Sequence, residues 1–367
     1  MKILIRTISL FLSLVLIYLL YVLLSYKRLP DKLELEVLSP AAGSADYNEV
    51  KINTEYTALT YNIGFGAYTP DFSFFMDGGK SSWAKSKASV VSAVVGAAEF
   101  IKNQKPDFSL IQEVDIDGTR SYHVDEFDLF SKQLADYYKV FAQNYDSAFL
   151  MYPPAQPHGK NKSGIALFSL YKIESSIRKS FPISKTLSKL LDLDRCYSIS
   201  RLPVENGKEL IIINLHMSAY GHSDEVRQGQ ISKLFNDMAQ EYEKGNYVLC
   251  GGDFNHDLKA AEDAEGDFES YTYPFPRSNV PKGFYFGMDR LGEVEKSKLR
   301  NTSRDSGKPF IEGESKTVTL DGFIFSENIE MISYENLNTG FIFSDHEPVK
   351  TVFKKKKQLI QQNLSRN

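Results

Sequence analysis

The sequence contains very little cysteine. Only Cys196 and Cys250 occur among its 367 residues, and both lie beside predicted strands. Two cysteines at this spacing exclude a disulfide framework and a zinc site built from cysteines. We therefore interpret both residues as buried thiols.

The chain also lacks a strong net charge. Its 43 basic and 47 acidic residues give a formal net charge of -4, so it has no broad electrostatic footprint for duplex nucleic acid. This near-neutral total does not exclude a local basic groove. No internal repeat of fixed period is visible. Hydrophobic residues make up 42% and aromatic residues 13%, which permits a sizeable core and excludes disorder of the chain as a whole.

The N-terminus carries one long apolar run. Residues 7–26 contain no charged residue, glycine or proline, and their length is about what an α-helix needs to cross a bilayer. Lys2 and Arg6 precede the run, Lys27 and Arg28 follow it, and no small-residue cleavage site closes it. We interpret it as an uncleaved signal anchor; the alternative, a buried core helix, is disfavoured because the run has no polar face.

The predicted anchor divides the chain into segments and indicates where in the cell the protein lies. We expect a single-pass membrane protein whose main domain is extracytoplasmic, because a short basic N-terminus usually stays in the cytoplasm. The similar basic counts on the two sides of the run do not decide the orientation. The predicted segments are a short tail (1–6), the transmembrane anchor (7–26), a linker (27–55), one catalytic domain (56–353) and a basic tail (354–367), for which a solvated tail is the expected structure.

The main body alternates predicted strands and helices, as α/β proteins do. Residues 259–316 are polar and irregular, and we expect them to form surface loops along one rim of a site. Predicted strands cover 56–62, 108–114, 164–169, 196–202, 210–217, 247–249 and 317–325, with a last one running into a Ser-Asp-His triplet at 344–346; predicted helices cover 83–103, 132–138 and 224–242.

The stretch from Cys250 to Asp257 carries the clearest chemical signal. It follows a short buried strand, and its two glycines let the backbone turn sharply close to a ligand. Asp253 and Asn255 then lie at the mouth of the strand, where open α/β sheets keep their sites. A carboxylate and an amide there can serve as proton acceptor and orienting donor. The alternative is an ordinary Asp/Asn/Gly turn.

Other polar residues also close predicted strands. Asn62 ends the first strand beside glycines, and this pattern is also typical of an ordinary turn. Glu113 ends the second strand, either as a solvated rim residue or as a metal ligand. His216 ends the strand at 210–217, where a lone histidine is more often structural than catalytic. Asp321 interrupts the strand at 317–325, and Asp345 belongs to the Ser-Asp-His triplet.

Taken in order, these motifs resemble the endonuclease/exonuclease/phosphatase superfamily over about residues 56–353. Each motif is weak alone, but six in the family's order form a specific signal. The resemblance implies a four-layer α/β/β/α sandwich of two mixed sheets, an α/β (α+β) fold, and a Mg²⁺-dependent phosphoesterase. The motifs are Tyr61-Asn62, Leu110-Ile111-Gln112-Glu113-Val114, Asn214-Leu215-His216, Gly252-Asp253-Phe254-Asn255, Leu320-Asp321-Gly322-Phe323 and Ser344-Asp345-His346.

The resemblance also implies roles for these residues. Glu113 resembles the principal metal ligand, with Asn62 and Asp345 near the metal, which would be Mg²⁺ or alternatively Mn²⁺. One departure is Gly64, which stands where some branches have an acidic residue, and this argues against the apurinic-endonuclease branch. The other matches are Asp253 for the group that activates water, Asn255 for the donor that holds the phosphate and that aspartate, Asp321 and His346 for an Asp–His pair, His216 for a histidine against the phosphate, and Arg195 for a substrate-binding arginine.

The chemistry of these residue types agrees with such a reaction. A phosphodiester repels a water nucleophile until its charge is neutralised, and a hard cation held by carboxylate and amide oxygens does this. The first function hypothesis is therefore a membrane-anchored hydrolase that cleaves a phosphodiester or phosphomonoester by in-line attack of water. Its substrate could be a lipid head group, a soluble phosphoester or nucleic acid, and no protein partner is evident.

Three alternatives remain. The chain could be an endonuclease or deoxyribonuclease acting on DNA, which the bilayer tether and modest charge disfavour. It could be a catalytically silent metal- or phosphate-binding module on the same fold, although such a module does not need both a metal ligand and an Asp–His pair. The motifs could also be unrelated surface turns, which would not all fall at predicted strand ends.

Overall fold

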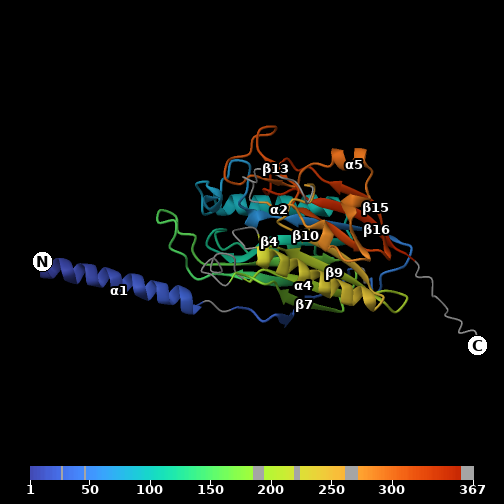
Figure 1. The fold of residues 1–367 in the computed structure, drawn as a ribbon, viewed down its shortest axis with the longest axis horizontal. Coiled ribbons are helices and arrows are strands. Elements are labelled where there is room, and N and C mark those ends of the chain that lie inside the picture. The colour runs from blue at the N-terminus through green and yellow to red at the C-terminus, as the bar shows by residue number, and fades with distance from the viewer. Residues whose placement is uncertain (26–27, 45–46, 185–193, 219–223, 261–271, 357–367) are drawn as a thin grey trace, which may run out of the picture.

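Two seven-stranded sheets form the centre of the molecule in the computed structural model of the chain, and helices cover their outer faces (Figure 1). The structure describes residues 1–25, 28–44, 47–184, 194–218, 224–260 and 272–356. The layers run from α4 through the two sheets to α2 and α3, which confirms the four-layer α/β/β/α sandwich.

The first sheet contains the strand that carries Asp253. Its strands β9 and β10 run parallel, and every residue of β10 is buried because the sheet is covered on both faces. In order across the sheet the strands are β1 (Lys32–Glu34), β7 (Ser175–Ser180), β8 (Cys196–Pro203), β9 (Glu209–His216), β10 (Tyr247–Asp253), β14 (Asp321–Ser326) and β11 (Phe284–Phe286).

The second sheet contains the strand that carries Glu113. Its parallel pair is β3 and β4, and the remaining pairs are antiparallel. In order the strands are β15 (Ile329–Asn336), β16 (Val349–Lys355), β3 (Glu55–Asn62), β4 (Phe108–Gly118), β6 (Asn161–Ser169), β5 (Tyr138–Asp146) and β2 (Val37–Leu38). A separate two-stranded ribbon joins β12 (Ser303–Arg304) to β13 (Thr317–Val318).

The core follows the alternation of side chains along the strands. Ala58 of β3 faces the other sheet, whereas Leu59 of the same strand faces the outer helices. Burial of such apolar area is the main favourable term in folding. The helices are α1 (Lys2–Ser25), α2 (Lys87–Asn103), α3 (Glu126–Gln133), α4 (Asp224–Glu243) and α5 (Glu293–Lys298), with short 3₁₀ turns at Gly64–Gly66, Phe75–Asp77, Arg277–Asn279 and Gly287–Arg290.

A buried polar network joins the two sheets. Gln112 Nε2 donates to Asn214 Oδ1 at 2.7 Å, and the Asn214 amide donates to the carbonyl oxygens of Ile111 and Ala166 at 3.2 and 2.9 Å. Buried amides without partners would be destabilising. The network therefore fixes how the sheets lie against each other beneath the strand ends.

Three predicted elements differ from the structure in more than a few residues at one end. The helix expected at 132–138 is α3, which ends at Gln133, and β5 already begins at Tyr138. The triplet at 344–346 does not end a strand: Phe341 has a φ of 54°, which extended backbone does not allow, and β16 begins after it at Val349. The strand expected at 317–325 divides into β13 and β14.

The expected linker and basic tail also pair with the sheets. Within 27–55, β1 pairs with β7 and β2 with β5, so this segment supplies an edge strand to each sheet rather than a free tether. Lys354 and Lys355 belong to β16, and Lys355 is fully buried, so the expectation of a solvated tail is wrong there. Residues 357–367 of that tail lie outside the described residues.

The apolar N-terminal run forms helix α1. It projects away from the sandwich (Figure 1), and Val22 is its only buried residue among those described. Its mean hydropathy of 2.5 and length of 24 residues are sufficient to cross a membrane. These properties fit a membrane span, and they are also those of a signal sequence.

Candidate active site

The ends of the central strands bring three of the candidate residues side by side in one sheet. In the register of the first sheet, Asp253 at the end of β10 pairs with His216 of β9 on one side and with Asp321 of β14 on the other. Gly252 has a φ of 147°, and a Cβ there would lie 2.1 Å from the Leu215 carbonyl oxygen, so only glycine permits this close pairing.

Asn62 links the two sheets at this edge. Its amide nitrogen donates to Asp253 Oδ2 at 2.9 Å and lies 3.3 Å from Glu113 Oε1, while its Oδ1 accepts from the Gly64 backbone nitrogen at 3.0 Å. A side chain from β3 therefore orients carboxylates from both sheets. The bond to Gly64 fixes the direction in which the amide points.

Glu113 lies at an irregularity in β4. The pairing of β4 with β6 shifts between Ile111 and Val114, and Glu113 has a φ of 54°. Such a bulge turns one side chain out of the regular alternation, and bulges often lie next to active sites. The Glu113 side chain, 26% exposed, lies with its Oε1 3.8 Å from His216 Nε2.

His346 lies between two carboxylates. Its Nδ1 is 2.8 Å from Asp321 Oδ2, and its Nε2 is 3.8 Å from Asp253 Oδ2. Burial by itself lowers the pKa of His346, but the charges of Asp321 and Asp253 outweigh it and raise that pKa well above its ordinary value. His346 therefore holds its proton more tightly than a solvated histidine does.

The central carboxylate has a perturbed pKa. Burial raises the pKa of Asp253 to about 6; the positive charge of His346 opposes this shift, and the charge of Asp321 adds to it. Asp253 Oδ1 accepts from the Asn255 backbone nitrogen at 2.8 Å. A buried carboxylate with a raised pKa is better suited to accept a proton near neutral pH than a solvated one.

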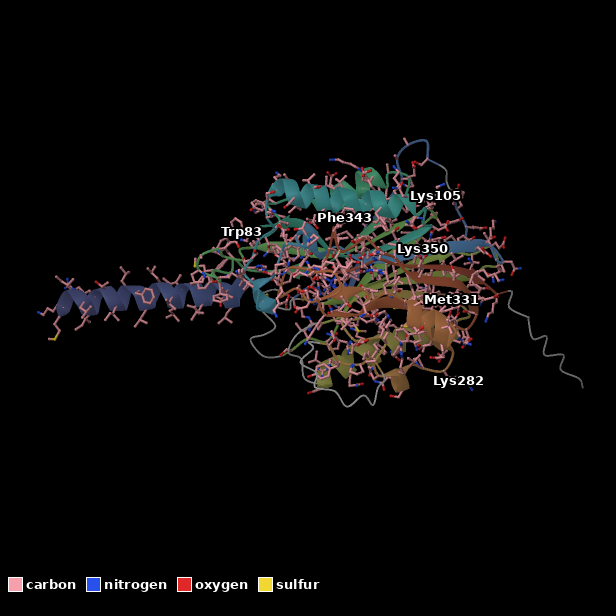
Figure 2. All side chains as sticks on the ribbon, turned by 90° about the horizontal axis from the view of Figure 1, so that it is seen from above. Trp83, Lys105, Lys282, Met331, Phe343 and Lys350 are labelled. Carbon is pink, nitrogen blue, oxygen red and sulfur yellow. The ribbon has the colours of Figure 1, made fainter. Side chains whose placement is uncertain are left out.

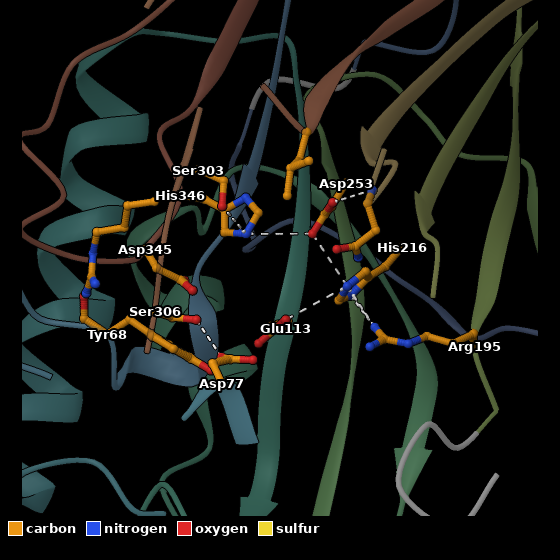
Figure 3. A pocket seen from close by; sticks show the side chains of 13 residues that line it. Tyr68, Asp77, Glu113, Arg195, His216, Asp253, Ser303, Ser306, Asp345 and His346 are labelled. Atoms are coloured by element: carbon orange, nitrogen blue, oxygen red, sulfur yellow. Dashed lines mark hydrogen bonds and ion pairs between the residues drawn. The ribbon is translucent and has the colours of Figure 1, made fainter. Parts of the chain in front are cut away.

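His216 and Arg195 form the opposite wall (Figure 3). The Arg195 Nη1 lies 2.7 Å from His216 Nε2 and 2.9 Å from its Nδ1, and that Nε2 is 3.5 Å from Asp253 Oδ2. Arg195 directly precedes β8, and the pairing of Tyr197 of β8 with Leu215 of β9 brings it to His216. Asn255, with a φ of 48°, donates its side-chain amide to the Met217 carbonyl oxygen at 2.9 Å, so its contact with Asp253 is made by the backbone.

Asp345 completes the set from the side of β16. Burial raises its pKa to about 7, although the charges of His346 and Arg304 oppose the shift. A Cβ on Gly64 would lie 3.0 Å from Asp345 Oδ1. Because Gly64 has no side chain, the space beside the Asp345 carboxylate is not filled.

A profile of the Endonuclease/Exonuclease/phosphatase family matches residues 59–288, more than half of the chain. The chain belongs to the endonuclease/exonuclease/phosphatase family. No curated protein matches the sequence.

Solved structures share the family fold at low sequence identity. The catalytic domain of human nocturnin with a bound sulfate anion is 17% identical, with a TM-score of 0.52 over 88% of this chain and 98% of that one. A family protein from Bacteroides vulgatus is 14% identical, with a TM-score of 0.53 over 83% and 100%. D. rerio TDP2 complexed with a single-strand DNA product is 13% identical, with a TM-score of 0.51 over 83% and 100%. At these identities the likeness shows the fold alone.

Seven of the nine residues expected from the family motifs line one cavity of about 60 Å³ (Figure 3). The other two, Asn62 and Asp321, lie behind it and contact its lining residues through the hydrogen bonds given above. The structure thus brings the whole predicted set together, while their individual roles stay predictions. The seven are Glu113, Arg195, His216, Asp253, Asn255, Asp345 and His346.

Sequence reasoning missed part of this lining. Arg304 is 1% exposed and its guanidinium donates to the carbonyl oxygens of Tyr68 and Thr69 at 3.3 and 3.1 Å, although residues 259–316 were expected to form surface loops. Asp77 accepts a hydrogen bond from Ser306. The only local signal for Asp77 is its place before two glycines. Phe72 and Phe74, from the same segment as Asp77, pack inward and are each 5% exposed.

The donor set fits the divalent cation that hydrolases of this family typically use. Glu113, Asp253 and Asp345 converge on one small cavity, and a cation there would counter the effects of burial and of neighbouring negative charge, which raise the pKa of the two aspartates. Donor atoms of Asp253, Asp321 and His346 lie within 4.8 Å of one another, and this group can also hold a metal. Asp321 Oδ1 is buried without a hydrogen-bond partner.

Proposed function

We propose that the chain is a membrane-anchored, Mg²⁺-dependent phosphoesterase that cleaves a phosphodiester or phosphomonoester by in-line attack of water. The observation that carries the proposal is the position of Asp253 Oδ2, which lies 2.9 Å from Asn62, 3.5 Å from His216 and 3.8 Å from His346. A proton acceptor, a neighbouring cation and an orienting amide thus surround one point at the edge of a cavity.

The metal is assigned to Glu113 and Asp345, with Asn62 in the shell around it, where its amide nitrogen contacts Glu113. This choice differs from the Asp253–Asp321–His346 group, because a protonated imidazole hydrogen-bonded to Asp321 has no lone pair to offer a metal. Bound there, Mg²⁺ would neutralise phosphate charge and lower the barrier to attack by water. Mn²⁺ satisfies the same oxygen donors.

The remaining residues act on the water and the phosphate. Asp253 accepts the proton of the attacking water, and His346, held by Asp321, donates to a phosphate oxygen on which charge develops. His216 and Arg195 line the opposite wall of the cavity and bind the phosphate or the leaving oxygen. Asn255 contributes its backbone to orient Asp253.

The test is a hydrolysis assay of the full chain in detergent, with Mg²⁺ and with EDTA. The substrates are sphingomyelin, phosphoinositides, bis-p-nitrophenyl phosphate, plasmid DNA and abasic DNA. We expect Mg²⁺-dependent cleavage of one class, reduced about 10²-fold or more by Asp253→Asn and by His346→Ala. Asp128→Asn and His123→Ala, which change exposed side chains in other parts of the domain, serve as controls.

Each outcome selects one function. Cleavage of DNA alone favours the nuclease alternative; the D. rerio TDP2 structure with a DNA product is a precedent for that ligand on this fold. Metal binding measured by calorimetry and abolished by Glu113→Gln, without cleavage of any substrate, favours a silent binding module. Full activity of both site variants with intact folding would overturn the proposed mechanism.

A further inference from the structure

One loop beside the site is uncharged and exposes large apolar side chains. Residues 147–159, the apolar loop, contain no acidic residue, lysine or arginine, and burial lowers the pKa of their only histidine, His158, to about 3, which keeps it neutral. Phe149, Met151 and Tyr152 are 38%, 57% and 68% exposed. Adjacent exposed apolar residues of this size usually mark a surface that another body covers.

The apolar loop lies against helix α1. Tyr18 Oη donates to the Phe149 carbonyl oxygen at 3.2 Å and accepts from the Met151 backbone nitrogen at 2.9 Å, and Tyr21 Oη accepts from the Phe149 backbone nitrogen at 3.2 Å. These contacts come from the half of the helix that is closer to the domain. The apolar loop is therefore held against the part of α1 that is nearer to the domain.

The hydrogen bonds of the apolar loop suit surroundings without water. Leu150 exchanges two backbone hydrogen bonds of 3.0 Å with Gly159 on the inner side. On the outer side, the backbone N–H groups of Phe149 and Met151 are bound by the tyrosine hydroxyls of α1. A loop edge in water needs no such partners, whereas backbone groups in a bilayer must find them within the protein.

The position of the contact along α1 indicates how deep in a bilayer the tip of the apolar loop would lie. Tyr18 lies seven residues before Ser25, where α1 ends, and at 1.5 Å per residue this is about 10 Å along the helix axis. If α1 crosses the membrane, the tip of the loop reaches past the head groups into the outer part of the acyl chains. That depth is typical of interfacial apolar elements.

The loop is also connected to the active site. Trp83 Nε1 donates to the Pro157 carbonyl oxygen at 2.6 Å, and the Phe75 and Tyr152 rings lie 6.0 Å apart. Both Phe75 and Trp83 belong to the segment 68–84, which supplies Tyr68 and Asp77 to the cavity. Figure 2 shows Trp83 at the end of the domain from which α1 projects, and Lys282 and Met331 toward the opposite end.

We propose that the apolar loop 147–159 is a membrane-contacting element, which inserts Phe149, Met151 and Tyr152 into the lipid interface beside α1. The partner is the bilayer itself, because the apolar loop is hydrogen-bonded to α1, the helix proposed to cross the bilayer. The proposal rests on the membrane anchoring in the proposed function. Its consequence is that the rim of the catalytic cavity is held at the lipid surface.

The experiment uses the full chain in phosphatidylcholine proteoliposomes. An environment-sensitive fluorophore is attached at Met151→Cys or, as a second variant, at Tyr152→Cys; Cys196 and Cys250 are fully buried and do not compete for the label. The matched control is Val294→Cys on α5, which is 67% exposed and apolar. We expect lipids carrying a doxyl quencher near the head group to quench the loop labels several-fold more than the Val294 label, and aqueous iodide to show the reverse order.

A label at Leu12→Cys reports separately on insertion of α1. If doxyl lipids quench that label but neither loop label, the loop proposal fails while membrane anchoring stands. If they do not quench it, the anchoring and the loop proposal fail together. Loop labels that are shielded from iodide but insensitive to doxyl lipids would mean that protein or a second copy covers the loop, which also overturns the proposal. Hydrolysis is not measured, so the outcome is independent of the proposed chemistry.

Discussion

The Nδ1 atom of His346 lies 2.8 Å from Oδ2 of Asp321, and both side chains are buried. Because the Asp321 charge raises the pKa of His346, Asp321→Asn should lower that pKa and leave the imidazole neutral at a lower pH. We expect the alkaline limb of the pH profile of kcat/KM to move to lower pH. If kcat/KM falls equally at every pH and the alkaline limb keeps its position, the role given to the Asp321–His346 pair is wrong. Circular dichroism of the variant checks that it folds.

Stability without metal should fall as the pH rises. The pKa values of Asp253 and Asp345 are raised from 3.8 to about 6 and about 7 in the folded protein. The folded state therefore binds protons more tightly than the unfolded state, and this stabilisation is complete below about pH 4 and is lost as the pH rises through 6 and 7. His346, whose pKa is also raised, acts in the same direction at higher pH.

Thermal unfolding in EDTA measures this effect. We expect a higher Tm at pH 5 than at pH 8, and a larger increase of Tm on adding Mg²⁺ at pH 8, because protons compete with the metal for the same carboxylates. The double variant Asp253→Asn/Asp345→Asn should show a flatter pH dependence. An equal Mg²⁺ effect at both pH values would place the metal elsewhere.

Gly64 should not tolerate a side chain. Its φ is 52°, and an added Cβ would lie 2.6 Å from Tyr68 Cδ2 and 3.0 Å from Asp345 Oδ1. Gly207→Ala is a matched control, because Gly207 has a φ of 75° but nothing within 4 Å of the added atom. Backbone strain alone costs about 1 kcal/mol or more in both variants. We expect only Gly64→Ala also to weaken Mg²⁺ binding, measured by calorimetry; equal affinities in the two variants would show that the Gly64 contact does not matter.

Much of the fold followed from strands whose composition is distinctive. The run that became β9 is almost wholly aliphatic, and the residues that close it and β10 were placed at the site by the family motifs to which they belong. The strands β7 and β15 were not predicted, because their alternating polar residues resemble loop sequence. Helix α3 was displaced, although Asp125 caps it through a 2.9 Å bond from the Asp128 backbone nitrogen.

The site was predictable only where a motif marked it. Arg304 and Asp77 are brought into the cavity by loops, and neither has a neighbouring pattern that distinguishes it from ordinary surface charge. The buried contacts of Arg304 with the Tyr68 and Thr69 carbonyl groups span more than two hundred residues of sequence. Local propensity carries no information about contacts of that separation.

Glu126 should position Glu113, the proposed metal ligand, from a distance. Its Oε2 accepts a 2.9 Å hydrogen bond from the backbone nitrogen of Asp115, two residues beyond Glu113, and it is fully buried. Asp115 in turn binds Arg120 through two hydrogen bonds of 2.7 and 3.0 Å. The bulge that gives Glu113 its φ of 54° is thus held immediately after the ligand.

Glu126→Gln and Glu126→Ala separate this role from burial alone. Glutamine keeps an oxygen that can accept the Asp115 hydrogen bond, and burial already raises the pKa of Glu126 well above its ordinary value, so a neutral side chain is close to the native state. We expect Glu126→Gln to retain Mg²⁺ affinity. Alanine leaves a buried N–H without a partner, which costs about 1–3 kcal/mol of unfolding free energy, and it should weaken Mg²⁺ binding about tenfold through the freed bulge. If both variants bind Mg²⁺ like the native chain while Glu126→Ala loses stability, Glu126 supports the fold without positioning Glu113.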